Sequence, residues 1–271
     1  MRVIRSLFRK KNKVDTGKKY GWFGHYPSWE QAYRETSGYD AAIILEKTRY
    51  ALLQVKSGNA VYERDSVLFD KKQYPFPLIT FLLHSALKEN RPLHILDFGG
   101  SLGSTYYQVK EFLGPNVCAS WNVVEQAHYV TCGKEYFQDA VLRFFSSVEE
   151  CLSEIEIDFV LLSSSVQYLK DPHEFLQKLV SFGFKYLLFD RTAFVNEPAD
   201  RLTIQHIPPE IYEASYPSWF FNEKRFLSHF HRKYVIGGEF SSYVPGESVM
   251  RIDGRSVGYS KGFYLINKHY A

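Results

Sequence analysis

The sequence lacks the features that mark membrane, secreted and disulfide-linked proteins. It contains no run of about 18 consecutive apolar residues, so no segment is predicted to span a membrane. The apolar part of the first residues is too short for a secretory signal. Cysteine is scarce: the three thiols are odd in number and have no metal-site spacing, which predicts reduced cysteines and a cytoplasmic protein.

Excess charge of one sign is also missing. The net charge is +3 over 271 residues, so bulk charge predicts no nucleic-acid partner. The basic stretch 1–19 is predicted to be a disordered tail, whose contact with an anionic membrane would be peripheral at most. No grouping of Asp, Glu and His has the spacing of metal ligands, so no metal site is predicted. Nothing in the pattern indicates an oligomeric state.

What is present is a glycine-rich stretch after an apolar run. Residues 93–98 predict a buried strand with Asp97 near its end, and 104–113 have helical periodicity. The turn between them holds Gly99, Gly100 and Gly103. The first two glycines allow positive φ and close approach of a ligand to the backbone, and the third lets the helix pack near the strand. The free amides that open this helix suit a ligand carboxylate, and Asp97 suits a cationic group beside it.

The spacing of these glycines excludes two common nucleotide motifs. A dinucleotide fingerprint requires Gly-x-Gly-x-x-Gly, and a P-loop requires Gly-Lys-Ser/Thr. Here two glycines are adjacent and no lysine follows. The pattern Asp-x-Gly-x-x-x-Gly instead resembles the first motif of the class I S-adenosylmethionine-dependent methyltransferases. In that family the loop wraps the amino-acid end of the cofactor, so the resemblance implies S-adenosyl-L-methionine. A glycine-rich turn in another doubly wound sheet is the alternative.

Other polar residues at predicted strand ends extend this cofactor site. Glu125 ends the strand 119–125, where an acid can accept both ribose hydroxyls of a nucleoside. The remaining predicted cofactor-binding residues are Gln126, Ser146, Ser147 and Ser163. The resemblance to class I methyltransferases implies that the two serines at the third strand end contact the adenine, although Ser147 is equally suited to cap the next helix. Ser163 opens a segment that resembles the family's post-strand motif, which implies that its side chains face the methyl group and the acceptor.

The order of elements predicts an α/β fold. Five parallel strands are predicted at 93–98, 119–125, 140–146, 157–164 and 185–190. A C-terminal antiparallel hairpin over 233–243 and 258–267 completes a Rossmann-like, seven-stranded methyltransferase sheet. Residues 191–221 are predicted to be a long connection. Residues 20–90 are predicted to form a helical N-terminal extension or lid, and 91–271 a catalytic domain.

Candidates for catalysis and substrate binding follow from the chemistry of methyl transfer. A hydroxyl acceptor needs a base that removes its proton, and His206 and Asp190 are the two candidates. The predicted substrate-binding residues are Arg64, Gln167, Tyr168 and Arg191. Arg64 offers a fork for a carboxylate or phosphate, but its run of charges also suits an internal ion-pair cluster that orients the extension. Four aromatic residues suit either a lid or ordinary packing: Tyr20, Phe23, Tyr26 and Trp29.

Several segments together resemble a narrower family. They are residues 24–32, 38–40, 61–66, 96–106, 123–126 and 200–203. They are similar to a bacterial family of methyltransferases that is associated with surface-polysaccharide biosynthesis genes. The resemblance covers nearly the whole chain from about residue 20. It implies that Asp97 and the three glycines bind the methionine part of the cofactor and that Glu125 binds the ribose.

The predicted function is therefore O-methylation of a sugar or glycan precursor, nucleotide-linked or lipid-linked, by an S-adenosylmethionine-dependent enzyme. Two alternatives from other classes are retained. One is a nucleotide-sugar or NAD enzyme on a similar sheet, which the glycine spacing disfavours. The other is a non-catalytic module that keeps the fold and binds glycan-assembly enzymes.

Overall fold

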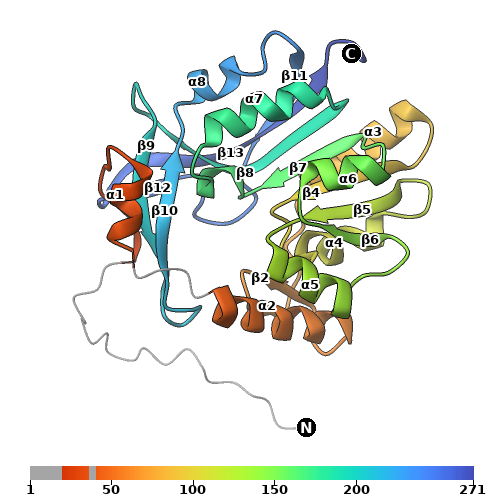
Figure 1. The fold of residues 1–271 in the computed structure, drawn as a ribbon, viewed down its shortest axis with the longest axis horizontal. Helices are drawn as coiled ribbons and strands as arrows, with labels where there is room; N and C mark the ends of the chain where they lie inside the picture. Colours follow the sequence, from red (N-terminus) through yellow and green to blue (C-terminus); the bar gives the residue numbers. More distant parts are fainter. Residues whose placement is uncertain (1–19, 37–40) are drawn as a thin grey trace.

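The structure is a computed structural model that describes residues 20–36 and 41–271. The predictions for the tail 1–19 and the resemblance over 38–40 lie outside these residues. Its centre is a mixed, 11-stranded sheet with helices on both faces (Figure 1). Among residues 20–36 and 41–271, no helix has the length and apolar character needed to cross a membrane.

Five neighbouring strands are parallel, as predicted. They are β4 (Leu93–Phe98), β5 (Cys118–Val124), β6 (Leu142–Phe145), β7 (Phe159–Ser163) and β8 (Tyr186–Val195). Their spatial order is β6-β5-β4-β7-β8, so the chain reverses direction across the sheet beside β4. Their residues are mostly apolar and buried, which is typical of parallel strands covered on both faces.

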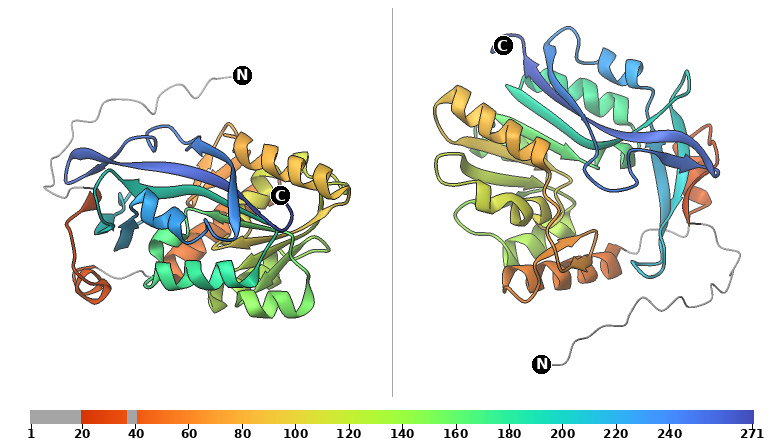
Figure 2. Two further views of the ribbon diagram at one scale, coloured as in Figure 1. Left: turned by 90° about the horizontal axis from the view of Figure 1, so that it is seen from above. Right: turned by 180° about the vertical axis from the view of Figure 1, so that it is seen from behind.

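Two apolar cores separate the sheet from its two layers of helices. The first layer holds α2 (Ala41–Lys56), α3 (Phe76–Glu89), α4 (Ser104–Val109), the short η1 (Lys110–Phe112) and α5 (Ala127–Tyr136). The second holds α6 (Val148–Glu154), α7 (Pro172–Phe182) and α8 (Glu223–Ser228). Figure 2 shows the sheet between them from two further directions. Asn222 caps α8 by accepting a hydrogen bond from the Arg225 amide at 3.0 Å.

The predicted C-terminal hairpin is confirmed. It consists of β11 (Tyr234–Ser241) and the long β13 (Arg255–Asn267), which inserts antiparallel between β11 and β8. A short strand between them, β12 (Met250–Ile252), also pairs with β13.

The predicted connection over 191–221 is wrong, and so is the count of seven strands. This part of the chain continues β8 and then forms β9 (Arg201–His206) and β10 (Ser215–Phe220). Both join the sheet through β1 (Gly21–Phe23), in the order β10-β9-β1-β12. Because β10 is the edge strand, Pro217 is tolerated within it. We call β1, β9 and β10 the sheet extension. Helix α1 (Trp29–Arg34) packs on it and is visible beside β9 and β10 (Figure 1).

Residues 20–90 are not purely helical, which corrects the prediction for this segment. Besides β1, they contain a hairpin of β2 (Tyr62–Arg64) and β3 (Val67–Phe69). Asp65 and Ser66 form its two-residue turn with φ of 52° and 68°, as in a type I′ turn. Such positive φ is uncommon for residues other than glycine. We call β2, β3 and this turn the β2–β3 hairpin, and it packs beside α2 and α4.

Candidate active site

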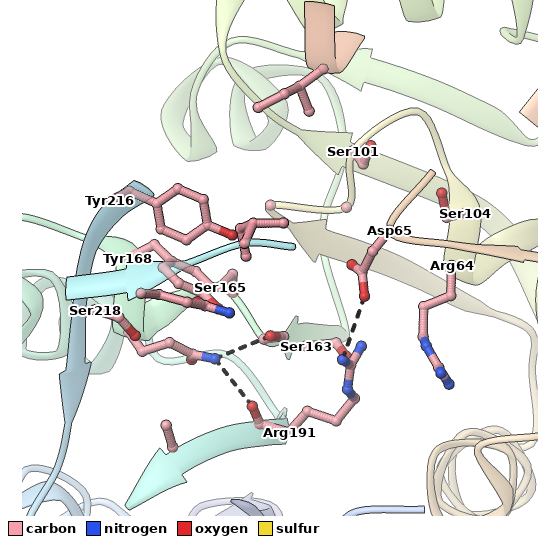
Figure 3. A pocket seen from close by; sticks show the side chains of 18 of the residues that line it. Arg64, Asp65, Ser101, Ser104, Ser163, Ser165, Tyr168, Arg191, Tyr216 and Ser218 are labelled. Atoms are coloured by element: carbon pink, nitrogen blue, oxygen red, sulfur yellow. Dashed lines mark hydrogen bonds and ion pairs between the residues drawn. The ribbon is translucent and has the colours of Figure 1, made fainter. Parts of the chain in front are cut away.

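A cavity of about 1030 Å³ lies beyond the ends of β4, β5 and β7 and beside β8. The sheet extension and the β2–β3 hairpin supply its other walls (Figure 3). Most of the predicted site residues line it: Arg64, Asp97, Gly99, Gly100, Glu125, Gln126, Ser146, Ser163, Gln167, Tyr168, Asp190, Arg191 and His206. Gly103 and Ser147 do not belong to its lining. The sheet thus brings together residues that are far apart in the sequence, at the place where open α/β sheets bind ligands.

Two positions of the glycine loop, Gly99 and Gly100, have no room for a side chain. Gly99 has φ of +73°, and its amide donates to the Val124 carbonyl at 2.9 Å. A Cβ at Gly99 would lie 2.8 Å from the Cβ of Ser165. A Cβ at Gly100 would lie 2.5 Å from the carboxyl carbon of Asp97. The loop backbone therefore packs directly against the carboxyl group and the segment after β7.

Two carboxyl groups lie at the ends of the neighbouring strands β4 and β5. Asp97 is 1% exposed, and its Oδ2 accepts a hydrogen bond from the Trp121 indole at 3.0 Å. Burial raises the pKa of Asp97 to about 7, although the Trp121 hydrogen bond acts in the opposite direction. Burial also raises the pKa of Glu125, which the amides of Gln126 and Ser101 lower in part. Neither carboxyl group forms an ion pair with a lysine or arginine of the described residues. A cationic or hydroxyl-bearing ligand would therefore stabilise the charged form of each group.

Two of the residues predicted to contact the cofactor, Gly103 and Ser147, have structural roles outside the cavity lining. Gly103 has φ of +92° and precedes α4, where a Cβ would lie 3.0 Å from Leu142. It shapes the turn from outside the cavity lining. Ser147 caps α6, because its hydroxyl accepts from the Glu150 amide at 3.0 Å. Its neighbour Ser146 does line the cavity.

A polar cluster connects β7 to β8. The Ser163 hydroxyl donates to Asp190 Oδ2 at 2.9 Å. Asp190 is 2% exposed, and burial raises its pKa to about 6 while the charge of Arg191 lowers it. The side-chain amide of Gln167 donates to Ser164 Oγ at 3.1 Å and to the Arg191 carbonyl at 3.2 Å.

The backbone at this cluster is strained. Ser164 and Arg191 have φ of 51° and 50°, an arrangement that costs about 1 to 3 kcal/mol per residue and is found mainly at functional sites. The bridging amide of Gln167 holds both residues in place. Asp190 and Ser163, which directly precede these two residues in the sequence, are joined by their own hydrogen bond.

The two arginines of the cavity already have partners. Arg191 donates from Nε and Nη2 to the two oxygens of Glu247, at 3.1 and 2.7 Å. Its Nη2 also lies 3.9 Å from Asp65 Oδ2, across the cavity (Figure 3). This contact between the hairpin and β8 is therefore formed by Asp65 and Arg191. Arg64 donates to the side chain of Gln73 at 2.7 Å and lies over the Phe69 ring.

Aromatic rings with polar atoms form the wall opposite the glycine loop. The Tyr168 hydroxyl donates to Gln205 Oε1 at 2.9 Å, and its ring meets Tyr216 edge to face at 5.3 Å (Figure 3). His206 lies on β9, where burial lowers its pKa. Gln205 and Tyr216 were not predicted, because they belong to strands that the sequence did not reveal. Of the four predicted lid aromatics, Tyr20 and Trp29 line the cavity, whereas Phe23 and Tyr26 do not.

Buried polar atoms without a protein partner concentrate around this cavity. Of nine such side-chain atoms among the described residues, six belong to residues that line it. They are Glu63 Oε1, Ser165 Oγ, Gln167 Oε1, Asp190 Oδ1, Ser218 Oγ and Ser260 Oγ. Buried polar atoms are normally hydrogen-bonded, so this concentration indicates a site for a polar ligand. No group of three metal-ligating side chains occurs in the described part of the chain.

No family model matches the chain. No curated protein matches it either.

Several solved structures are similar in fold. The N-terminal domain of EvdMO1, in the presence of S-adenosylhomocysteine and D-fucose, is 12% identical over 84% of this chain and 97% of that chain, with a TM-score of 0.47. The 1,6-didemethyltoxoflavin-N1-methyltransferase of Burkholderia thailandensis is 11% identical over 85% and 91%, with a TM-score of 0.43. The glycopeptide N-methyltransferase MtfA, complexed with S-adenosyl-L-methionine, is 8% identical over 70% and 93%, with a TM-score of 0.46.

Proposed function

We propose that this protein is an S-adenosylmethionine-dependent methyltransferase. The observation that carries the proposal is the position of Asp97 and Glu125, which lie at the ends of neighbouring parallel strands and line the same cavity. Between them in the sequence is the glycine loop, in which Gly99 and Gly100 have no room for a Cβ. An acid at the first strand end suits the amino-acid part of such a cofactor, and an acid at the second suits the ribose hydroxyls.

The residues present fit this cofactor. Asp97, Gly99 and Gly100 would hold its methionine part, Glu125 its ribose, and Gln126 with Ser146 its base. When bound, the cofactor supplies a methyl group on a positively charged sulfur. The charges of the cavity suit a cation: its lining contains six carboxyl groups and two guanidinium groups, and both guanidinium groups already have partners in the protein.

Asp190 is the better of the two candidate bases. Among the described residues its Oδ1 has no hydrogen-bond partner, whereas Oδ2 accepts from Ser163, so one oxygen is positioned and the other is available for a proton. A carboxyl group with a pKa of about 6 is mostly ionised at neutral pH and can accept the proton of an acceptor hydroxyl. His206, in the sheet extension, remains the second candidate.

The acceptor that we propose is a hydroxyl of a sugar or glycan precursor, in line with the resemblance to a family associated with surface polysaccharides. The wall formed by Tyr168, Tyr216 and Gln205 supports this. Flat aromatic faces contact the apolar faces of sugars, and the polar tips beside them hydrogen-bond sugar hydroxyls. The cavity lies at the upper end of the range of about 300–1000 Å³ that is usual for ligand pockets, which favours a large ligand.

The proposal is tested by isothermal titration calorimetry with S-adenosylhomocysteine. We expect micromolar or tighter binding by the wild type and a loss of about tenfold or more in Asp97→Ala and Glu125→Ala. Glu149→Ala, on exposed α6 outside the cavity, is the matched control and should bind like the wild type.

Three outcomes would contradict parts of this proposal. Absence of binding by the wild type would reject the function, and binding of NADH in its place would favour the NAD-enzyme alternative. Unchanged affinity in both variants would reject the site. Binding without turnover on any glycan precursor would favour the non-catalytic module.

A further inference from the structure

Glu63 is a buried acid that forms no ion pair with any lysine or arginine of the described residues. It lies in the middle of β2, is 2% exposed and lines the cavity. Its Oε2 accepts a hydrogen bond from the Ser66 amide at 3.2 Å, within the turn of the β2–β3 hairpin. Its Oε1 has no hydrogen-bond partner in the part of the chain that the structure describes.

The surroundings of Glu63 make this arrangement costly in the absence of a ligand. No lysine or arginine of the described residues forms an ion pair with it: the adjacent Arg64 donates to Gln73, and Arg191 is held by Glu247. Burial raises the pKa of Glu63 to about 7, an effect that the Ser104 hydroxyl and the Ser66 amide reduce but do not abolish. A neutral glutamine would accept the Ser66 hydrogen bond equally well. The hairpin fold alone therefore does not require an acid at this position.

The position of Glu63 indicates which part of a ligand it would meet. The hairpin packs against α4, and Ser104, the first residue of that helix, lies beside the Glu63 carboxyl group. Ser104 comes directly after the glycine loop, so this is the side of the cavity where the amino-acid part of the proposed cofactor lies. Figure 3 shows Ser104 and Ser101 on the same side as the hairpin residues Arg64 and Asp65.

We propose that Glu63 binds the ammonium group of the cofactor's methionine part through Oε1. An ammonium group supplies the donor and the positive charge that this oxygen lacks, and a charge-assisted hydrogen bond in a buried site is strong. The assignment rests on the proposed function. The assignment gives the β2–β3 hairpin a definite role. Besides lining the cavity, the hairpin supplies a third acid, in addition to Asp97 and Glu125 at the strand ends.

The test compares two ligands that differ only at the proposed contact region. S-adenosylhomocysteine carries the amino acid, whereas 5′-methylthioadenosine keeps the adenosine and the thioether without it. In Glu63→Gln we expect the affinity for S-adenosylhomocysteine to fall by about tenfold to a hundredfold. The affinity for 5′-methylthioadenosine should stay within about twofold of the wild type. Glu149→Gln, which replaces an exposed glutamate on α6, is the control and should change neither affinity.

A second readout follows from the ionisation of Glu63. Binding of an ammonium group favours the charged carboxylate, so the wild type should release protons on binding S-adenosylhomocysteine near pH 7. Calorimetry in phosphate and in Tris buffers measures this release. It should be smaller in Glu63→Gln, with Asp97 as the remaining source.

Each outcome separates this assignment from the proposed function. If the wild type fails to bind S-adenosylhomocysteine, the proposed function is wrong. If the wild type binds and Glu63→Gln binds equally well, only the assignment of Glu63 is wrong. Equal losses for both ligands would also overturn it, because they would show that Glu63 supports the cavity as a whole. A folded Glu63→Gln protein is verified by an unchanged circular dichroism spectrum and a cooperative thermal transition.

Discussion

Asp65 Oδ2 and Arg191 Nη2 lie 3.9 Å apart and join the tip of the β2–β3 hairpin to the central strand β8 across the cavity. The carboxylate is 61% exposed, whereas the guanidinium is 13% exposed and has Glu247 as its closer partner. The contact thus connects a surface turn to a buried charge network. The same hairpin carries Glu63 and Arg64, so we expect the positions of these two cavity residues to depend on the contact between Asp65 and Arg191.

Asp65→Asn should loosen the hairpin without unfolding the protein. The turn is preserved, because asparagine tolerates positive φ. We expect the affinity for S-adenosylhomocysteine to fall by a few-fold and the free energy of unfolding to change by less than about 1 kcal/mol. Calorimetry and denaturant titration measure these quantities. Asp70→Asn, at an exposed position after β3, is the control, and affinities that are the same in the two variants would refute a role of the ion pair.

Gly100→Ala should abolish high-affinity cofactor binding. The added methyl group would lie 2.5 Å from the Asp97 carboxyl carbon, so either the loop or the carboxyl group must move. We expect a loss of about tenfold or more in S-adenosylhomocysteine affinity and about 1–3 kcal/mol of stability. Gly114→Ala is the matched control, since nothing lies within 4 Å of a Cβ at that position. Similar affinities for the two alanine variants would show that the glycine loop does not contact the ligand.

Asp97 should make the ligand-free protein less stable as the pH rises. Its folded-state pKa of about 7 lies above the ordinary aspartate value, so the folded state binds more protons than the unfolded state between about pH 4 and 7. Stability attributable to this group is therefore present at low pH and lost as the pH rises through 7. Asp97→Asn, which can still accept the Trp121 hydrogen bond, removes the effect.

At pH 8, Asp97→Asn should exceed the wild type by about 2–4 kcal/mol in the free energy of unfolding, and at pH 4 the two should be similar. Denaturant titrations at both pH values measure the difference. A constant difference between the variants across this range would mean that Asp97 titrates normally in the folded protein.

The raised pKa of Asp190 leads us to expect an acidic limb in the pH–rate profile. With a pKa of about 6, its carboxylate is lost below that pH, so kcat/KM for a hydroxyl acceptor should fall about tenfold per pH unit there. Asp190→Asn should lower kcat by about a hundredfold or more while S-adenosylhomocysteine binding persists. His206→Ala is the comparison. If that variant loses turnover while Asp190→Asn retains it, the base is the histidine.

Those parts of the fold and site that depend on local patterns could be predicted from the sequence. The buried strands ending near Asp97 and Glu125 are mostly apolar, and the glycines between them have spacing that restricts the ligand class. The helix cap at Asn222 is local too, because its partner Arg225 is only three residues away. Each of these features is determined by a few consecutive residues.

The sheet extension could not be predicted in this way. Strand β10 contains Pro217, which on pattern alone argues against a strand, and it is tolerated only because β10 lies at the edge. Strand β1 has three residues, too few for a periodic pattern, and it exists because β9 and β12 supply its hydrogen bonds. Gln205 and Tyr216 therefore reach the cavity through pairings between distant segments.

Glu63 shows the same limit at the level of one side chain. In the sequence it belongs to a run of charges, where ion pairing or solvation is the natural expectation. Its burial comes from the packing of the hairpin on α4, and its lack of a cation results from Arg64 and Arg191 having other partners. Neither fact is visible without the tertiary structure.

The pairing of strand β1 also determines when the sheet can be completed during synthesis. Trp22 pairs with Gln205 on one side and Ile252 on the other, so the first described strand has neither partner until residue 205 has been translated and lacks the second until residue 252. At the usual pace of a ribosome this delay is roughly ten seconds or more. Throughout that interval the aromatic segment around Trp22 has no sheet partner, so β1 joins the sheet only after β9 has been made.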